Sequence, residues 1–453
     1  MKILVKGAGD LATGIAWRLK KAGHSILMTD LKIPTAVRRT VSFSRAIYEG
    51  EAEVEGITAV AVGDINEAAA VIARDAIPVI ADPEAAIRAD FAPDIIVDAI
   101  IAKKNTGTKI SDAGFVIGVG PGFTAGVDCH CVVETKRGHY LGKVIWEGSA
   151  EPNTGIPGNI GGYTTERIIR AGADGIFTPV RSIGDTVSKG DLLAEAGKVP
   201  ICASIDGMIR GMLQNGVAVT AGMKCGDIDP RCEADHCMTI SDKARAIGGG
   251  VLEAVSSYIH KRTDTALVLL AAGSGTRFGA NKLLHMHNGR RLFEYAVDAG
   301  TSVLTRIIVT GYDEIAEYAG FKGYKVVWNN DPDLGISHSV KLGLASFTGD
   351  AGTSPAAAVF SVCDQPALTS KTVDRLINAY AASSKGLACL ASSQDGEEVL
   401  GNPCLFSRAY FEELSQLEGD TGGKRVILRH LSDLARAGAD MEELTDIDYR
   451  EQI

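Results

Sequence analysis

The stretch LVLLAAGSGTRFGANK, residues 267–282, most constrains the fold of this chain. Its apolar run, Leu267 to Leu270, ends abruptly in a loop with three glycines, one arginine and one lysine. Such a run predicts a buried strand of an α/β sheet, and open α/β sheets bind ligands where their strands end. Glycines let main-chain N–H groups approach phosphate oxygens, while Arg277 and Lys282 supply positive charge. The segment therefore predicts a phosphate-binding edge, although its spacing does not fit the G-x-x-x-x-G-K-[ST] loop.

Length and composition place the chain among ordinary multidomain proteins. A chain of 453 residues, 45% apolar and 23% charged, predicts about two to four domains. The net charge of −10 argues against nucleic acid as the main partner. The beginning, MKILVKGAGD, lacks the pattern of a signal peptide, and no uninterrupted apolar run is long enough to span a bilayer. Because the nine cysteines are scattered rather than arranged as a disulfide framework, we expect a cytoplasmic protein that binds no membrane.

Residues 1–127 carry the pattern of a Rossmann-like, doubly wound parallel sheet. Helix-like stretches alternate with strand-like runs at 2–7, 25–29, 57–62, 77–81, 94–100 and 115–119. Residues 7–12, GAGDLA, match G-x-G-x-x-A, and Asp30 follows the first glycine at the distance expected for a ribose contact. The pattern predicts an NAD-like dinucleotide held by Gly7, Gly9, Asp10 and Asp30. The alternative is that the glycines only make a tight turn.

Two other groups in the N-terminal part allow more than one interpretation. Arg38 and Arg39 follow the second predicted strand, where they either bind a phosphate or form a solvated pair. The second group could supply soft metal or selenium ligands, or could simply pack as small apolar side chains; it comprises Cys129, His130, Cys131, Cys232, His236 and Cys237. Structural zinc sites usually show paired C-x2-4-C spacings, which favours packing.

Residues 128–240 predict a β-rich domain with an internal repeat. The pattern D-G-x8-G-x2-V-x2-G occurs twice, 32 residues apart, at Asp174, Gly175, Gly184, Val187 and Gly190 and again at Asp206, Gly207, Gly216, Val219 and Gly222. Two copies predict two interlocked hairpin units, with glycines in turns and valines in a shared core. The pattern resembles biotinyl/lipoyl-type barrel-sandwich domains, whose modified lysine lies at a hairpin tip between methionines. The corresponding stretch, 199–204, has no lysine, which argues against a carrier. Residues 241–263 predict a linker helix interrupted by three glycines.

Residues 264–453 add polar segments to the glycine-rich loop. Asp364 follows an apolar strand, Val359–Val362, and a carboxylate at a strand end suits Mg²⁺. Ser339 lies at a predicted helix start, where it suits a contact to a base or ribose. Asn402 follows a polar turn, in Gly401-Asn402-Pro403, and Asp420 lies in a glycine-rich segment before a predicted helix at 425–436.

In this order and spacing, the segments resemble the MocA-like family of molybdenum cofactor cytidylyltransferases over about 190 residues. The family signature LAAGxSxRxGxxK matches residues 270–282, with Gly275 in place of its serine. The resemblance implies an α/β nucleotidyltransferase domain that transfers CMP from CTP to molybdopterin and releases pyrophosphate. It implies Mg²⁺ on Asp364, with Asp420 and Asn402 as further candidates for the metal or pterin site. It also implies a catalytic and nucleotide-binding set of Arg277, Lys282, Ala271, Ala272, Gly273, Gly275 and Ser339. Related guanylyltransferases have glycine at position 272, so the alanine favours CTP over GTP.

Residues 1–260 resemble the YqeB-like accessory proteins of selenium-dependent molybdenum hydroxylases. The resemblance rests on VKGAGDLATGIAWRLKKAG, on PTAVRRTVSF and on residues 222–231. It implies a pathway and a client hydroxylase rather than a reaction. We therefore expect a fused cofactor-maturation protein. The alternatives are a cytidylyltransferase acting on a sugar or alcohol phosphate, and an N-terminal part that only binds a dinucleotide or acts as a chaperone.

Overall fold

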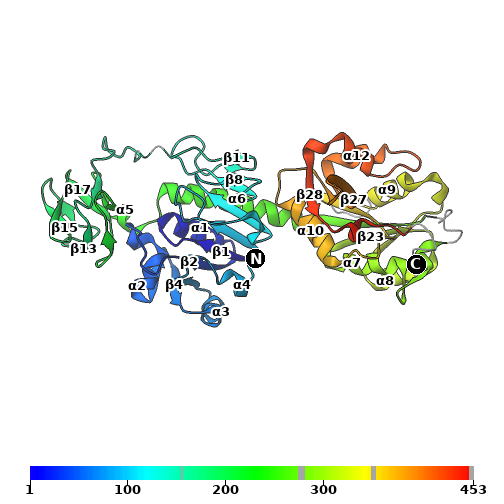
Figure 1. The fold of residues 1–453 in the computed structure, drawn as a ribbon, viewed down its shortest axis with the longest axis horizontal. Helices are drawn as coiled ribbons and strands as arrows, with labels where there is room; N and C mark the ends of the chain where they lie inside the picture. The colour runs from blue at the N-terminus through cyan, green and yellow to red at the C-terminus, as the bar shows by residue number, and fades with distance from the viewer. Residues whose placement is uncertain (154, 156, 274–280, 348–353, 448–453) are drawn as a thin grey trace. The chain divides into compact units, whose positions relative to one another are not determined.

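The computed structural model describes residues 1–453 except 154, 156, 274–280, 348–353 and 448–453. It divides into two compact units, Met1–Val255 and Ser256–Ile453, which are described separately (Figure 1). Within the described ranges, no helix combines the length and the apolar character that crossing a membrane requires.

A nine-stranded sheet forms the centre of the first unit. Its order is β10-β9-β7-β6-β1-β2-β5-β4-β3, and all neighbours are parallel except the two edge pairs. The strands are β1 (Lys2–Lys6), β2 (Ser25–Thr29), β3 (Glu51–Val54), β4 (Ile57–Val62), β5 (Ile77–Ile80), β6 (Ile95–Asp98), β7 (Phe115–Val119), β9 (Cys131–Val133) and β10 (Val144–Ile145). The six predicted strands are therefore confirmed. The sheet also continues past residue 127, because β9 pairs with β7 and β10 pairs with β9.

Four α-helices in the described part of the chain connect strands of this sheet, and two of them, α2 (Ala46–Glu49) and α4 (Arg88–Phe91), are single turns. The other two are α1 (Asp10–Lys21) and α3 (Ile65–Ala73). The Asp64 side chain caps α3 by accepting from two backbone N–H groups of its first turn. Between β5 and β6 the helical structure is only the single turn of α4.

Two four-stranded antiparallel sheets form the middle of the chain, in the orders β12-β19-β17-β14 and β16-β15-β13-β18. Their strands are β12 (Ile168–Arg170), β13 (Gly175–Pro179), β14 (Thr186–Val187), β15 (Leu192–Ala196), β16 (Val199–Cys202), β17 (Gly207–Met212), β18 (Ala218–Val219) and β19 (Lys224–Asp229). The predicted interlocking of the two repeats is confirmed. Gly175 of the first copy pairs with Val219 of the second, and Val187 of the first pairs with Gly207 of the second. Both valines are buried in one apolar cluster.

The second unit contains a seven-stranded sheet in the order β24-β23-β20-β25-β27-β26-β28. Its strands are β20 (Thr265–Ala271), β23 (Thr305–Thr310), β24 (Lys325–Trp328), β25 (Ala357–Val362), β26 (Leu387–Gln394), β27 (Glu397–Ser407) and β28 (Leu434–Gly438). β20 lies between β23 and β25 and is parallel to both. Leu267 and Leu269 pack in the core on one face of β20, and Val268 packs on the other. This two-sided burial explains the uninterrupted apolar run.

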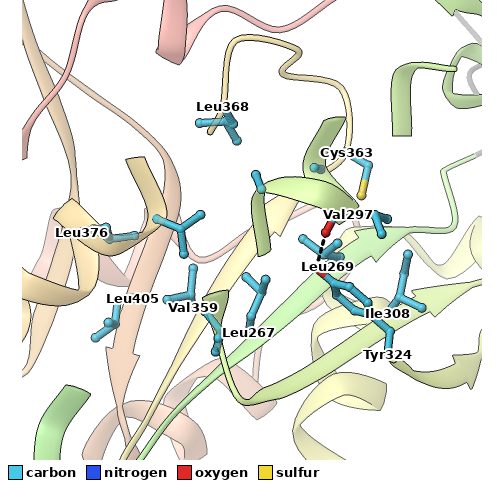
Figure 2. Close-up of a cluster of buried hydrophobic side chains, with 14 of the residues drawn as sticks. Leu267, Leu269, Val297, Ile308, Tyr324, Val359, Cys363, Leu368, Leu376 and Leu405 are labelled. Carbon is cyan, nitrogen blue, oxygen red and sulfur yellow. Dashed lines mark hydrogen bonds between the residues drawn. The ribbon is translucent and has the colours of Figure 1, made fainter. Parts of the chain in front are cut away.

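Helices cover both faces of this sheet: α7 (Leu292–Ala299), α8 (Asp313–Phe321), α9 (Ile336–Ala345), α10 (Ser370–Ala381), α11 (Phe411–Ser415) and α12 (Lys424–Arg429). Figure 2 shows the core around Leu267 and Leu269, with Cys363 at its margin. In that core the buried Tyr324 donates its hydroxyl hydrogen to the carbonyl of Val297 at 2.8 Å.

Candidate functional site

The loops after β20 and β25 meet at the carboxyl edge of the second unit's sheet. Lys282 begins a short 3-10 helix that follows the glycine-rich loop, and Asp364 lies two residues beyond β25. Their side chains form an ion pair of 2.7 Å between Nζ and Oδ2. Lys282 also donates to the carbonyl of Ile447 at 3.0 Å. The structure thus brings together two of the three predicted catalytic residues, whereas Arg277 lies outside the described residues.

One carboxylate oxygen of Asp364 has no hydrogen-bond partner in the described part of the chain. Its neighbours Cys363 and Gln365 are buried, while its own side chain is 15% exposed. Oδ1 is buried without a hydrogen-bond partner among the described residues. A buried carboxylate oxygen without a partner requires an explanation, and a bound cation would provide one. Its chemistry fits Mg²⁺, which takes one or two carboxylates together with substrate phosphates and water. Over the same residues, no group of three or more His, Cys, Asp or Glu side chains could hold a metal.

The backbone that leads into the glycine-rich loop is held from β23. Ala271 and Ala272 are buried, and Gly273 is exposed with open space where a Cβ would lie. The Thr310 hydroxyl donates to the carbonyl of Ala271 at 3.0 Å, and the Tyr312 hydroxyl donates to that of Gly273 at 3.2 Å. Gly275, the fourth predicted residue of this loop, lies outside the described residues.

Thr310 and Tyr312 were not predicted. The available signal was their position, Thr310 as the polar last residue of a parallel strand and Tyr312 just after it, at the edge shared with β20. Thr310 is fully buried, and its Oγ1 also accepts from the Tyr312 backbone N–H at 3.2 Å. One hydroxyl therefore joins the ends of two strands.

The other predicted residues of the second unit lie in three surroundings. Ser339 on α9 is buried and accepts a 2.9 Å hydrogen bond from the side-chain amide of the buried Asn329. Asp420 is exposed; its neighbour Gly419 accepts from the Ser337 N–H at 3.2 Å, which places this turn beside the start of α9. Asn402 lies on β27, two residues before the Cys404 that pairs with Phe360 of β25. Asn402 therefore lies near the edge at which β25 ends.

The four residues predicted for a dinucleotide line one cavity of the first unit. Gly7, Gly9, Asp10 and Asp30 surround about 330 Å³ where β1, β2 and α1 meet. Gly7 has φ +94°, and a Cβ there would lie 2.9 Å from the carbonyl oxygen of Ala99. Asp30 accepts from the N–H groups of Ala8 at 2.8 Å and Leu31 at 2.7 Å. Burial nevertheless raises the pKa of the Asp30 carboxyl above its ordinary value.

The two arginines after β2 are structural in this unit. Arg38 is buried and donates to the carbonyls of His236 at 2.8 Å and Thr239 at 3.1 Å, and it pairs with Asp10 at 3.6 Å. Arg39 donates to the carbonyl of Met212 at 2.8 Å. The solvated pair that the sequence allowed is therefore wrong.

Three of the four cysteines considered as soft ligands are buried. Burial raises the pKa of the Cys129 thiol to about 12 and raises that of the Cys131 thiol well above its ordinary value. His130 accepts from the Val116 N–H at 2.9 Å, and burial lowers its pKa to about 4. Cys237 is buried, and Cys232 is exposed. These surroundings fit packing rather than ligation.

The hairpin tip in the middle sheets differs from the prediction. β16 already begins at Val199, and the turn between β15 and β16 is Gly197-Lys198. An exposed lysine therefore lies at the tip, and the expectation that the tip lacks one is wrong. Its neighbours are glycine and valine rather than methionine. The argument against a carrier now rests on those neighbours alone.

Comparison with known proteins agrees with this division. Residues 267–434 match the family model of the MobA-like NTP transferase domain. The "Uncharacterized protein YqeB" of Escherichia coli K12 is 49% identical over 259 residues, which cover 57% of this chain and 48% of that protein. The "Bifunctional protein GlmU" of Mycobacterium ulcerans is 30% identical over 145 residues, which cover 29% of this chain and 28% of that protein. The chain thus spans about half or less of the length of these relatives.

A solved structure also matches part of the chain. It is the homologue of Mycobacterium tuberculosis Rv0371c from Mycobacterium sp. strain JC1, which is 24% identical, with 42% of this chain and 93% of that chain covered and a TM-score of 0.35. From the sequence comparisons, the C-terminal unit contains a MobA-like NTP transferase domain, and the N-terminal 57% of the chain is a homologue of E. coli YqeB.

Proposed function

We propose that the C-terminal unit transfers CMP from CTP to the terminal phosphate of molybdopterin and releases pyrophosphate. The contact between Lys282 and Asp364 carries the proposal, because it joins a cation and a carboxylate where β20 and β25 end, inside a MobA-like domain. Open α/β sheets bind their ligands at this edge.

In this reaction an oxygen of the molybdopterin phosphate attacks the α-phosphorus of CTP. A new P–O bond forms, the bond between the α-phosphorus and the bridging oxygen breaks, and its electron pair leaves with pyrophosphate. The acceptor phosphate is itself the nucleophile, so the protein needs to supply only position and charge. Lys282, together with Arg277, holds the triphosphate and the leaving pyrophosphate. Asp364 would hold Mg²⁺ through Oδ1, and Mg²⁺ supplies Lewis-acid stabilisation of the phosphate oxygens when bound.

The test is CTP-dependent pyrophosphate release by three variants of the full chain. Asp364→Ala and Asp364→Asn each remove the carboxylate charge, and loss of one such electrostatic group typically costs ~10²–10³ in rate. Asp395→Asn is the matched control, because Asp395 is an exposed carboxylate in the turn between β26 and β27. We expect near-complete loss in the first two variants and normal release in the third. Normal release by Asp364→Asn would remove Asp364 from the mechanism.

The choice of nucleotide and of acceptor needs separate assays. The buried methyl of Ala272, at the start of the loop, supports a narrow base pocket and therefore CTP over GTP. Equal turnover of the two nucleotides by the unmodified chain would contradict this choice. Mass spectrometry of the product distinguishes a pterin dinucleotide from a CDP-linked sugar or alcohol, which is the alternative substrate class.

For the N-terminal part we propose a Rossmann-like domain that binds an NAD-like dinucleotide, followed by a barrel-sandwich domain, in a protein that serves a selenium-dependent molybdenum hydroxylase. The four predicted residues that line one cavity support the dinucleotide. Gly9 caps the start of α1 and has open space around its missing Cβ. Gly9→Asp would place a carboxylate where the pyrophosphate is expected, so NAD(H) binding by fluorescence titration should be lost. Unchanged binding would exclude this cavity.

A further inference from the structure

A second cavity of the first unit is rich in arginine. It has a volume of about 540 Å³ and shares no lining residue with the cavity around Gly7 and Asp30. Three arginines line it, together with His236 and Asp242; they are Arg137 between β9 and β10, Arg210 on β17 and Arg231 after β19. Three guanidinium groups in one cavity are unusual in a chain whose net charge is −10.

Two of the three arginines are neutralised by a carboxylate of their own. Arg137 donates to both oxygens of Asp242, at 2.6 and 3.1 Å. Arg231 donates to both oxygens of Asp229, at 2.7 and 2.9 Å. Such two-point pairs satisfy both partners and hold their geometry.

Arg210 is different. Its side chain is 10% exposed, and its Nε donates to the carbonyl of His236 at 3.3 Å. The carboxylate that pairs with it is Asp229, at 3.9 Å, and that oxygen already accepts from Arg231. Neither Nη group of Arg210 has a hydrogen-bond partner among the residues that the structure describes. Both Nη groups of this nearly buried guanidinium are therefore available as donors to a ligand.

The charged neighbours of Arg210 have both signs. Burial and then the positive charge of Arg38 lower the pKa of Arg210, against the opposing effect of the Asp227 and Asp229 carboxylates. Burial and then Arg137 lower the pKa of Lys243, at the start of the helix α6 (Asp242–Thr263). Nδ1 of His236, which lines the cavity, is buried without a hydrogen-bond partner in the described part of the chain. Arg210, with its unused donor groups, therefore lines a cavity together with two further arginines.

We propose that this cavity binds a tetrahedral oxyanion, the phosphate group of a small molecule, with Arg210 as its central contact and Arg137 and Arg231 at its sides. The planar guanidinium matches two phosphate oxygens at once. The cavity volume also leaves room for a small organic group beside the phosphate.

The test is isothermal titration of the full chain at low ionic strength with two probes, inorganic phosphate and glycerol 3-phosphate. Arg210→Gln removes the central guanidinium, and charge-assisted hydrogen bonds of this kind correspond to roughly 10- to 100-fold in affinity. The matched control is Arg181→Gln, because Arg181 is an exposed arginine at the end of β13 in the same sheets. We expect phosphate binding that weakens with salt, is lost in Arg210→Gln and is unchanged in Arg181→Gln.

A second variant should bind phosphate more tightly, and a gain of affinity cannot be explained by misfolding. Asp242→Asn removes the exposed carboxylate that pairs with Arg137, and we expect it to tighten phosphate binding several-fold. Tighter binding of glycerol 3-phosphate than of phosphate identifies a phosphate ester as the ligand, and equal binding identifies the free oxyanion. The proposal is overturned if neither probe binds saturably, or if both arginine variants weaken binding equally. Pyrophosphate release by the C-terminal unit tests the proposed function separately.

Discussion

The hydroxyl of Thr310 joins the ends of β20 and β23, so its removal tests how the glycine-rich loop is positioned. Thr310→Val keeps the branched shape of the side chain and replaces the hydroxyl with a methyl group. In the structure that hydroxyl donates to Ala271 at 3.0 Å and accepts from the Tyr312 N–H at 3.2 Å, with Thr310 fully buried. The change therefore loses two hydrogen bonds at a position that water does not reach.

The expected loss of stability follows from these contacts. A hydrogen bond contributes about 1 kcal/mol net, and a buried donor left without a partner costs about 1 kcal/mol or more. The added methyl recovers only about 0.8 kcal/mol of transfer free energy. We therefore expect the free energy of unfolding of this sheet to fall by about 2 kcal/mol. Thr310→Ser keeps the hydroxyl and loses one methyl, so it should retain both hydrogen bonds.

Hydrogen exchange measured by mass spectrometry reports this loss of stability for the second unit alone. Peptides from β20, β23 and β25 report the second sheet separately from the N-terminal unit. We expect faster exchange in Thr310→Val than in Thr310→Ser, together with a higher KM for CTP, because the loop that carries Lys282 starts at Ala271. If the valine variant is as well protected as the unmodified protein, the assigned role of the hydroxyl is wrong.

Two further predictions concern the first unit. Gly207→Ala should destabilise the middle sheets by about 2 kcal/mol or more, because φ is +155° and the new Cβ would lie 2.6 Å from Cγ2 of Ile228; Gly216→Ala, with φ +86° and open space, should cost less, and equal thermal shifts would contradict the steric argument. The His130 pKa of about 4 lies below its unfolded value of 6.5, so the unfolded chain binds more protons between these values. Stability should therefore fall by about 2 kcal/mol from pH 7 to pH 5 in the unmodified protein. It should fall less in His130→Asn, whose Oδ1 can replace Nδ1 as the acceptor for Val116; identical pH profiles in urea unfolding would refute this.

Local sequence patterns predicted the elements that are buried on both faces or repeated. The apolar runs that became β1, β2, β4, β5, β6 and β7 appear within a few residues of their predicted bounds. The repeat predicted interlocked hairpins because each copy carries the same glycines and the same core valine. The family resemblance put Lys282 and Asp364 in one catalytic set, and the structure brings them together because the loops after the parallel neighbours β20 and β25 share one edge.

Long-range contacts account for what the sequence did not reveal. The pairing of β9 with β7 depends on an unpaired sheet edge, which no local pattern shows. Thr310 and Asn329 act through hydrogen bonds to distant residues, and each looks like an ordinary strand-end residue in the sequence. The hairpin tip was misplaced by a few residues because turn boundaries are the least regular part of a β pattern.

In the helix α6 (Asp242–Thr263), local helix propensity wrongly predicted an interruption. Three consecutive glycines, 248–250, predicted an interruption, since each costs about 1 kcal/mol relative to alanine inside a helix. The helix is nevertheless continuous. A Cβ on Gly248 would lie 2.8 Å from the carbonyl oxygen of Gly14 on α1, and one on Gly250 would lie 2.0 Å from that of Gly142. Any larger residue would separate these backbones, so Gly248 and Gly250 are required by close packing, whereas Gly249 has open space. Because α1 starts at the cavity around Gly7 and Asp30, and Asp242 lines the arginine-rich cavity, this close contact sets the position of one cavity wall against the other.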